Sequence, residues 1–288
     1  MNAQQVLSAL RAKAKPGTAA IYRRHGAQGE VLGVSYADMN ALVKRLPADQ
    51  ELARALWRSG VHEAWVVAPQ LADPARTTRA ELARWLKQAG DPIAVTALAG
   101  LAARAAAGAE LALEWIDSRQ ELPATCGWNV LGILAGEGRL GEAAAARLLQ
   151  RIERELQASP DRTRYAMNNT LIAIGGYMAP LRAQALQVAR AVGKVQVDHG
   201  QTGCKTPDAA SYIAKMAARQ AARQAAKPAR QSAPKARQSA PKARQSAPKA
   251  RQSAPKAGSR SAAKRGGRPT APAATRPGSP TRRSRRAV

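Results

Sequence analysis

The chain has no phenylalanine, 3% aromatic residues and only two cysteines among its 288 residues. Two cysteines cannot form a disulfide framework, so we expect Cys126 and Cys204 to be reduced thiols in a cytoplasmic protein of bacterial type. No window offers about twenty apolar residues without charge, which argues against a membrane span. The first residues, MNAQQVLSALRAKAKPG, are polar within every turn and do not resemble a signal peptide. A core made of Leu, Val, Ile, Ala and five Trp favours close-packed helices.

Acidic residues are absent from the segment 219–288, which holds twenty of the 46 Lys and Arg residues. The remaining 26 basic and 19 acidic residues give positions 1–218 a charge of only about +7, out of +27 for the chain. The heptad RQSAPKA occurs four times without change over 230–257. A polycation of this density favours polyanionic partners, DNA or RNA before others.

We expect the segment 219–288 to be a disordered, self-repelling tail. Its heptads place proline at every seventh position, and proline interrupts helices. It has almost no side chain larger than Ala to bury, so nothing offsets an ordering cost of roughly 1–2 kcal/mol per residue. A solubilising spacer is the alternative to a nucleic-acid tether. Membrane binding is not expected, because no lipidation motif or apolar helical face is present.

The first 218 residues suffice for one domain and follow a helical pattern with short breaks. The N-caps predicted for the early helices are Ser35, Asp49, Thr77 or Thr78, and Asp91, the last followed by Pro at the first helical position. Further helices are predicted over 92–107, 109–117, 121–135, 141–158, 162–177 and 180–193, with a last one starting near Pro207. The alternation in KVQVDH is too short to predict a strand.

About a dozen helices joined by turns of two to five residues predict an all-α fold. A helix pair every 35–45 residues is typical of a HEAT-like α-solenoid. Because internal self-similarity is weak, a compact bundle without repeats is the alternative.

Four separated segments carry a family resemblance: YRRHGAQGEVLGVSYADMNALVKRL (22–46), ELARALWRSGVHEAWVVA (51–68), RYAMNNTLIAIGGY (164–177) and VDHGQTGCKTPDAASYI (197–213). In this order they resemble the DNA alkylation repair family, the AlkD-like HEAT-repeat proteins, over most of residues 18–216. The resemblance implies a curved solenoid whose basic concave face holds duplex DNA. Its characterised glycosylases excise alkylated purines such as N3-methyladenine and N7-methylguanine.

The catalytic pattern of those glycosylases does not carry over to this chain. They use an acidic residue four positions after a Trp, which can stabilise the oxocarbenium sugar, together with an Arg on a neighbouring helix. Here Thr125 stands where that Arg is expected, and Asp91 is explained as a helix cap. The residues four positions after the five Trp are Val61, Pro69, Ala89, Arg119 and Gly132.

Other possible sites have simpler explanations. Trp115 and Asp117 point in different directions on a helix, so we expect a core Trp and a helix-end Asp. His62 and Glu63 begin a helix, where Glu suits the macrodipole and His is expected at a turn or interface. His199 and Cys204 are too few for a zinc site, and we expect no metal or cofactor.

Nucleic-acid contacts are predicted at basic residues beside helix starts and in the tail. Lys205 lies with Gly200 and Gly203 just before the last helix, where backbone N–H groups could meet a phosphate; an ordinary turn is the alternative. Arg23, Arg24, Arg162 and Arg164 are further candidates, which the alternative makes solvated surface residues. The tail candidates are Arg230, Lys235, Arg237, Lys242, Arg244, Lys249, Arg251 and Lys256.

Together these features predict a cytoplasmic, nucleoid-associated monomer that binds duplex DNA and recognises or excises alkylated purines. A second hypothesis is a DNA-binding scaffold or nucleoid-type protein that has the fold without the glycosylase activity. A third is an RNA- or ribosome-associated factor, because a basic tail does not distinguish RNA from DNA.

Overall fold

The computed structural model describes residues 1–199 and 203–231. Within them the chain forms thirteen α-helices, two short 3-10 helices and no β-strand, so the all-α prediction is confirmed. The α-helices are α1 (Ala3–Arg11), α2 (Pro16–Arg24), α3 (Tyr36–Val43), α4 (Gln50–Trp57), α5 (His62–Leu71), α6 (Arg79–Gln88), α7 (Pro92–Ala102), α8 (Gly108–Trp115), α9 (Glu121–Gly136), α10 (Glu142–Glu155), α11 (Asp161–Tyr177), α12 (Arg182–Val192) and α13 (Ala209–Gln231). The 3-10 helices are η1 (Leu156–Ala158) and η2 (Ala179–Leu181).

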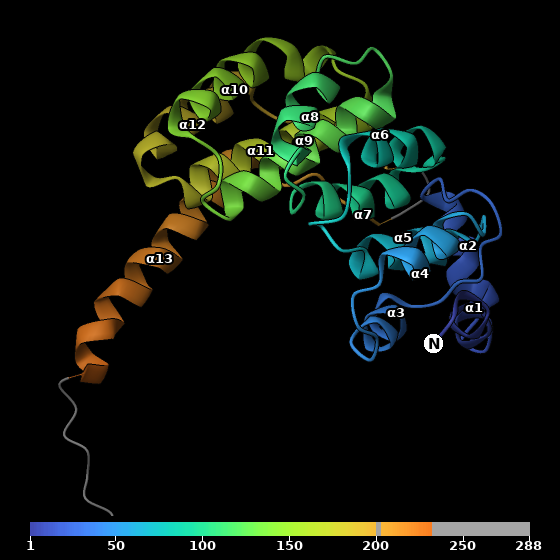
Figure 1. The fold of residues 1–288 in the computed structure, drawn as a ribbon. Helices are drawn as coiled ribbons and strands as arrows, with labels where there is room; N and C mark the ends of the chain where they lie inside the picture. The colour runs from blue at the N-terminus through green and yellow to red at the C-terminus, as the bar shows by residue number, and fades with distance from the viewer. Residues whose placement is uncertain (200–202, 232–288) are drawn as a thin grey trace, which may run out of the picture. The chain divides into compact units, whose positions relative to one another are not determined.

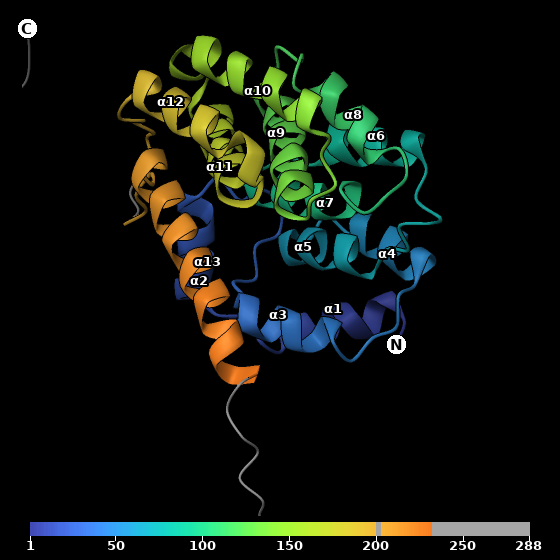
Figure 2. The same cartoon turned by 90° about the vertical axis from the view of Figure 1, so that its left-hand side faces the viewer.

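The helices from α4 to α13 form two layers, as Figures 1 and 2 show. In one layer α5, α7, α9, α11 and α13 pack on one another in succession. Each of the helices α4, α6, α8, α10 and α12 packs on the helix that follows it in the chain. This pairing is that of a HEAT-like α-solenoid, in which each pair buries its apolar faces against the next.

The predicted helix caps account for most of the early helix boundaries. Ser35, Asp49, Thr78 and Asp91 each accept hydrogen bonds from backbone N–H groups in the first turn that follows. These bonds satisfy donors that have no partner inside the helix. The polar residues between the apolar runs therefore set where α3, α4, α6 and α7 begin.

Two features differ from the sequence expectation. The helices α1 and α2 precede the first one predicted; a capping box between Asn2 and Gln5 begins α1, and Pro16 begins α2. The helix predicted to run to 107 ends at Ala102. The chain turns there because Gly108 packs onto the carbonyl of Ala102, where a Cβ would lie 1.6 Å from the oxygen.

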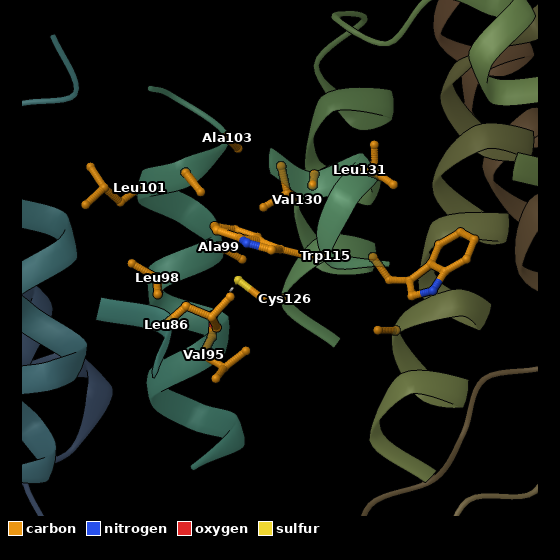
Figure 3. Packing of buried hydrophobic residues seen from close by; sticks show 14 of the residues in the cluster. Leu86, Val95, Leu98, Ala99, Leu101, Ala103, Trp115, Cys126, Val130 and Leu131 are labelled. Carbon is orange, nitrogen blue, oxygen red and sulfur yellow. Dashed lines mark hydrogen bonds between the residues drawn. The ribbon is translucent and has the colours of Figure 1, made fainter. Parts of the chain in front are cut away.

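One continuous core joins the helix layers. Figure 3 shows part of it, in which Trp115 and Cys126 lie between α7 and α9 beside Leu98 and Val130. Four of the five Trp side chains are buried and the fifth, Trp65, is half-buried. Large indole rings thus supply the apolar bulk that phenylalanine usually provides.

The last helix continues past position 218, where we expected the tail to begin. In both Figure 1 and Figure 2, α13 runs on beyond the ends of α11 and α12 as far as Gln231. Residues 194–199, the segment KVQVDH, form no strand. No helix in the described ranges is long and apolar enough to span a membrane.

Candidate nucleic-acid interface

A pocket of about 240 Å³ opens on the layer that contains α7, α9 and α11. Pro92, Ile93 and Thr96 come from the first turns of α7. His25 and Tyr36 reach the pocket from the end of α2 and the start of α3. The α9 and α11 residues that complete it are Thr125, Asn129, Arg162, Tyr165, Ala166 and Asn169.

The pocket combines aromatic rings with uncharged polar groups. Tyr36 is 48% exposed although it follows a helix cap, so its ring is available to a ligand. Thr96, Asn129 and Asn169 also line an adjoining hollow of about 270 Å³ along the same three helices. The two hollows therefore form one groove, in which side-chain amides and hydroxyls on a largely apolar surface can accept or donate hydrogen bonds.

Basic groups from three parts of the chain surround His25. Burial lowers the pKa of His25, and the nearby Arg162, Arg24 and His199 lower it further. The ring of His199 packs edge-on against Tyr165 at 5.3 Å and lies 3.0 Å from the Thr206 hydroxyl. Bringing cationic groups together is unfavourable unless an anion is bound, so this end of the pocket suits a phosphate group.

Acidic side chains are absent from the described residues that line the pocket and its adjoining hollow. The nearest acidic groups, Asp91 and Glu63, raise the pKa of Tyr36, a smaller effect than the burial of its hydroxyl. Asp91 is fully buried and accepts hydrogen bonds from Gln28 N, Ile93 N and Ala94 N, besides pairing with His62. The Asp91 carboxylate is therefore committed to the start of α7 and to His62.

Glu63 and His62 serve the fold instead. The Glu63 carboxylate accepts hydrogen bonds from three successive backbone N–H groups, those of Leu32, Gly33 and Val34, at 2.6–3.2 Å. This holds the segment before α3 against α5 and so fixes Tyr36 at the pocket. His62, the first residue of α5, is fully buried, with its Nδ1 atom 3.0 Å from the Asp91 carboxylate at the start of α7.

The predicted basic residues have different environments. Arg162 lines the pocket, and Arg24 lies close enough to affect His25, so the structure brings these two together. Arg23 points toward the Val31 carbonyl at 3.5 Å. Arg164 lies outside the pocket lining and is committed to the fold, because it donates to Ser159 O and Gln196 O and pairs with Asp161.

The predicted phosphate site before the last helix differs from expectation. Lys205 is exposed, but α13 begins at Ala209 rather than at Pro207. Asp208 accepts a hydrogen bond from Ser211 N, so a carboxylate occupies the helix start where we expected a phosphate. Arg230 lies within α13. The candidates Lys235, Arg237, Lys242, Arg244, Lys249, Arg251 and Lys256 lie outside the described residues.

Asp117 and Trp115 do not form a joint site. Asp117 pairs with Arg151 on α10 at 2.5 Å, whereas Trp115 is buried toward α7. Among the described residues no three His, Cys, Asp or Glu side chains gather as metal ligands would.

Sequence analysis missed His25, Tyr36, Tyr165, Asn129 and Asn169 as pocket residues. They come from the end of α2, the start of α3, α9 and α11, and only the packing of these distant segments brings them together.

The fold and the pocket define a helical-repeat protein with a groove lined by aromatic, amide, hydroxyl and basic side chains. Residues 6–228 match the model of a family described as DNA alkylation repair enzyme. The chain belongs to this DNA alkylation repair family.

Two relatives match most of the length of this chain. The chain is 31% identical over 218 residues to the uncharacterised protein Lin0241 of Listeria innocua, and 30% identical over 218 residues to the uncharacterised protein Lmo0209 of Listeria monocytogenes. Each match covers 73% of this chain and 95% of the relative.

A solved structure matches 76% of this chain and 95% of its own, with a TM-score of 0.70 and 28% identity. It represents proteins described as related to the HEAT-like repeat DNA glycosylases, with affinity for branched DNA structures.

Proposed function

We propose that this protein binds DNA, with a preference for branched DNA, and does not excise alkylated bases. The observation that carries the proposal is the pocket between α7, α9 and α11, which has Arg162, His25 and two tyrosines but no carboxylate. Phosphate contacts position DNA without chemistry, and aromatic rings stack on bases that are exposed where a duplex branches. The structurally similar proteins with affinity for branched DNA support the same choice.

The alternative is that the protein excises alkylated purines, as the name of the family suggests. A cationic alkylated base is a good leaving group, but a glycosylase still needs a group that stabilises the developing sugar cation. The Asp91 carboxylate at the start of α7 is already occupied by four hydrogen-bond partners, and the Glu121 carboxylate accepts from Arg162 N at 2.8 Å. We therefore favour binding over excision.

Two measurements test the proposal. Fluorescence anisotropy with a four-way junction, a linear duplex and a single-stranded RNA of matched length should give the lowest Kd for the junction. Methylated DNA incubated with the protein should release no 3-methyladenine or 7-methylguanine above a protein-free control. Release of either base would establish the alternative, and equal Kd values for all three nucleic acids would contradict the preference.

A further inference from the structure

The helix α13 carries a basic stripe that does not line the pocket. Lys215, Arg219 and Arg223 follow one another at intervals of four residues and are all exposed. Four residues of α-helix span about 6 Å and turn by about 40° beyond a full rotation, so the three side chains form one gently winding row. In sequence Lys227 continues the same spacing, and the helix backbone extends through it to Gln231.

The packing of α13 shows that this row is held in a fixed register. Ile213 is fully buried, and a Cβ added to Gly175 on α11 would lie 2.6 Å from its Cδ1 atom. Gln220 donates to the Gly176 carbonyl at 2.8 Å and accepts from Arg182 at 2.6 Å. These contacts fix the apolar side of α13 against α11 and α12, and so set the direction in which Lys215 and Arg219 project.

The composition of α13 makes the row costly without a partner. Positions 209–231 contain no acidic residue, and Ala fills most of the remaining positions. Like charges four residues apart destabilise a helix by roughly 0.2–0.5 kcal/mol per pair. A Glu in place of every second cation would have formed stabilising pairs of opposite charge. Among the ion pairs of the described residues, none contains any of these three cations; the pKa of Asp208 is lowered mainly by its hydrogen bonds with Ser211 and only slightly by Lys215. Three cations in a regular row without acidic partners are suited to bind a polyanion.

We propose that the row Lys215, Arg219 and Arg223 on α13 is a second contact surface for the phosphate backbone of duplex DNA, separate from the pocket. The inference rests on the proposed DNA binding. Duplex DNA carries one phosphate per 3.4 Å of each strand, so cations about 6 Å apart meet phosphates repeatedly as the helix crosses the backbone. The row precedes the basic C-terminal segment in the sequence.

The test uses the full chain with Lys215→Gln, Arg219→Gln and Arg223→Gln combined, and duplex DNA as the probe. The control combines Arg147→Gln, Arg154→Gln and Arg190→Gln, which removes the same charge from exposed positions on α10 and α12. The slope of log K against log salt should become shallower by about 0.9 for each lost phosphate contact, thus by about 2.7 in the α13 variant. The control should keep nearly the wild-type slope, and circular dichroism should show both variants folded.

Equal slopes in the two variants would overturn the α13 surface, because only net charge would then matter. If the wild-type chain itself fails to bind DNA, the proposed function fails instead, so the two failures are distinguishable. If the α13 variant proves unfolded, the single change Arg219→Gln against Arg154→Gln provides the same comparison with an expected difference of about 0.9.

Discussion

The Nδ1 atom of His62 lies 3.0 Å from Oδ2 of Asp91, and both side chains are fully buried. Burial alone would raise the pKa of Asp91, but the hydrogen bonds from His62 and from the backbone N–H groups of Ala94 and Gln28 lower it on balance. The Asp91 carboxylate is therefore an ionised structural group that joins α5 to the start of α7.

The change Asp91→Asn should lower the free energy of unfolding by about 3 kcal/mol, because it leaves a buried donor set without its charged acceptor. Since the folded pKa of Asp91 is below its ordinary value of about 3.8, its contribution is complete above roughly pH 4 and is lost as the pH falls through the folded pKa. Urea unfolding at pH 7 and at pH 3 measures both effects. Asp117→Asn is the control: Asp117 is 70% exposed, so its change should stay within about 1 kcal/mol. Equal losses for both variants would contradict a structural role for Asp91.

Substitutions of Arg162 and Arg164 should have different effects, because Arg162 lines the pocket and Arg164 stabilises the fold. Arg162→Gln should weaken binding to branched DNA by about 3–10-fold and reduce the salt slope by about 0.9, because one phosphate contact is lost. Arg164→Gln should leave the Kd within about twofold but cost roughly 1–3 kcal/mol of stability, because the Ser159 and Gln196 carbonyls lose their donors. Anisotropy and thermal unfolding of both variants check this. The assignment is wrong if the two variants exchange these effects.

The difference between these two arginines also shows how much of the fold and of the pocket could be predicted from the sequence. Helix caps and periodicity predicted the α-helical fold and most boundaries from Ser35 onward, since those signals are local. The sequence alone does not distinguish Arg162 from Arg164. In the structure Arg162 lines the pocket, whereas Arg164 donates to the Ser159 carbonyl before α11. The pocket itself depends on contacts between α2, α3, α7, α9 and α11, which no local pattern encodes.

His25 predicts a dependence of DNA binding on pH. Its pKa is lowered below the ordinary value of 6.5, first by burial and then by Arg162, Arg24 and His199. A bound phosphate would favour the protonated imidazole and raise that pKa, so affinity should increase as the pH falls from 7.5 to 5.5 at constant salt. Each unit by which binding raises the pKa corresponds to up to about tenfold in Kd. His25→Gln should remove most of this dependence, and an unchanged pH profile in that variant would exclude His25 as the responsible group.

The end of α13 at Gln231 predicts how chains shortened from the C-terminus behave. Deleting 232–288 removes sixteen Lys and Arg residues but leaves all of α13 in place. We expect the free energy of unfolding to stay within about 0.5 kcal/mol of the full chain, while the salt slope for DNA becomes much shallower. Deleting 219–288 should instead destabilise the protein, because it also removes Gln220, which donates to the Gly176 carbonyl and accepts from Arg182. Urea titrations and salt-dependent anisotropy on both deletions separate the two roles. A full-length slope in the shorter deletion would mean that the tail makes no phosphate contacts.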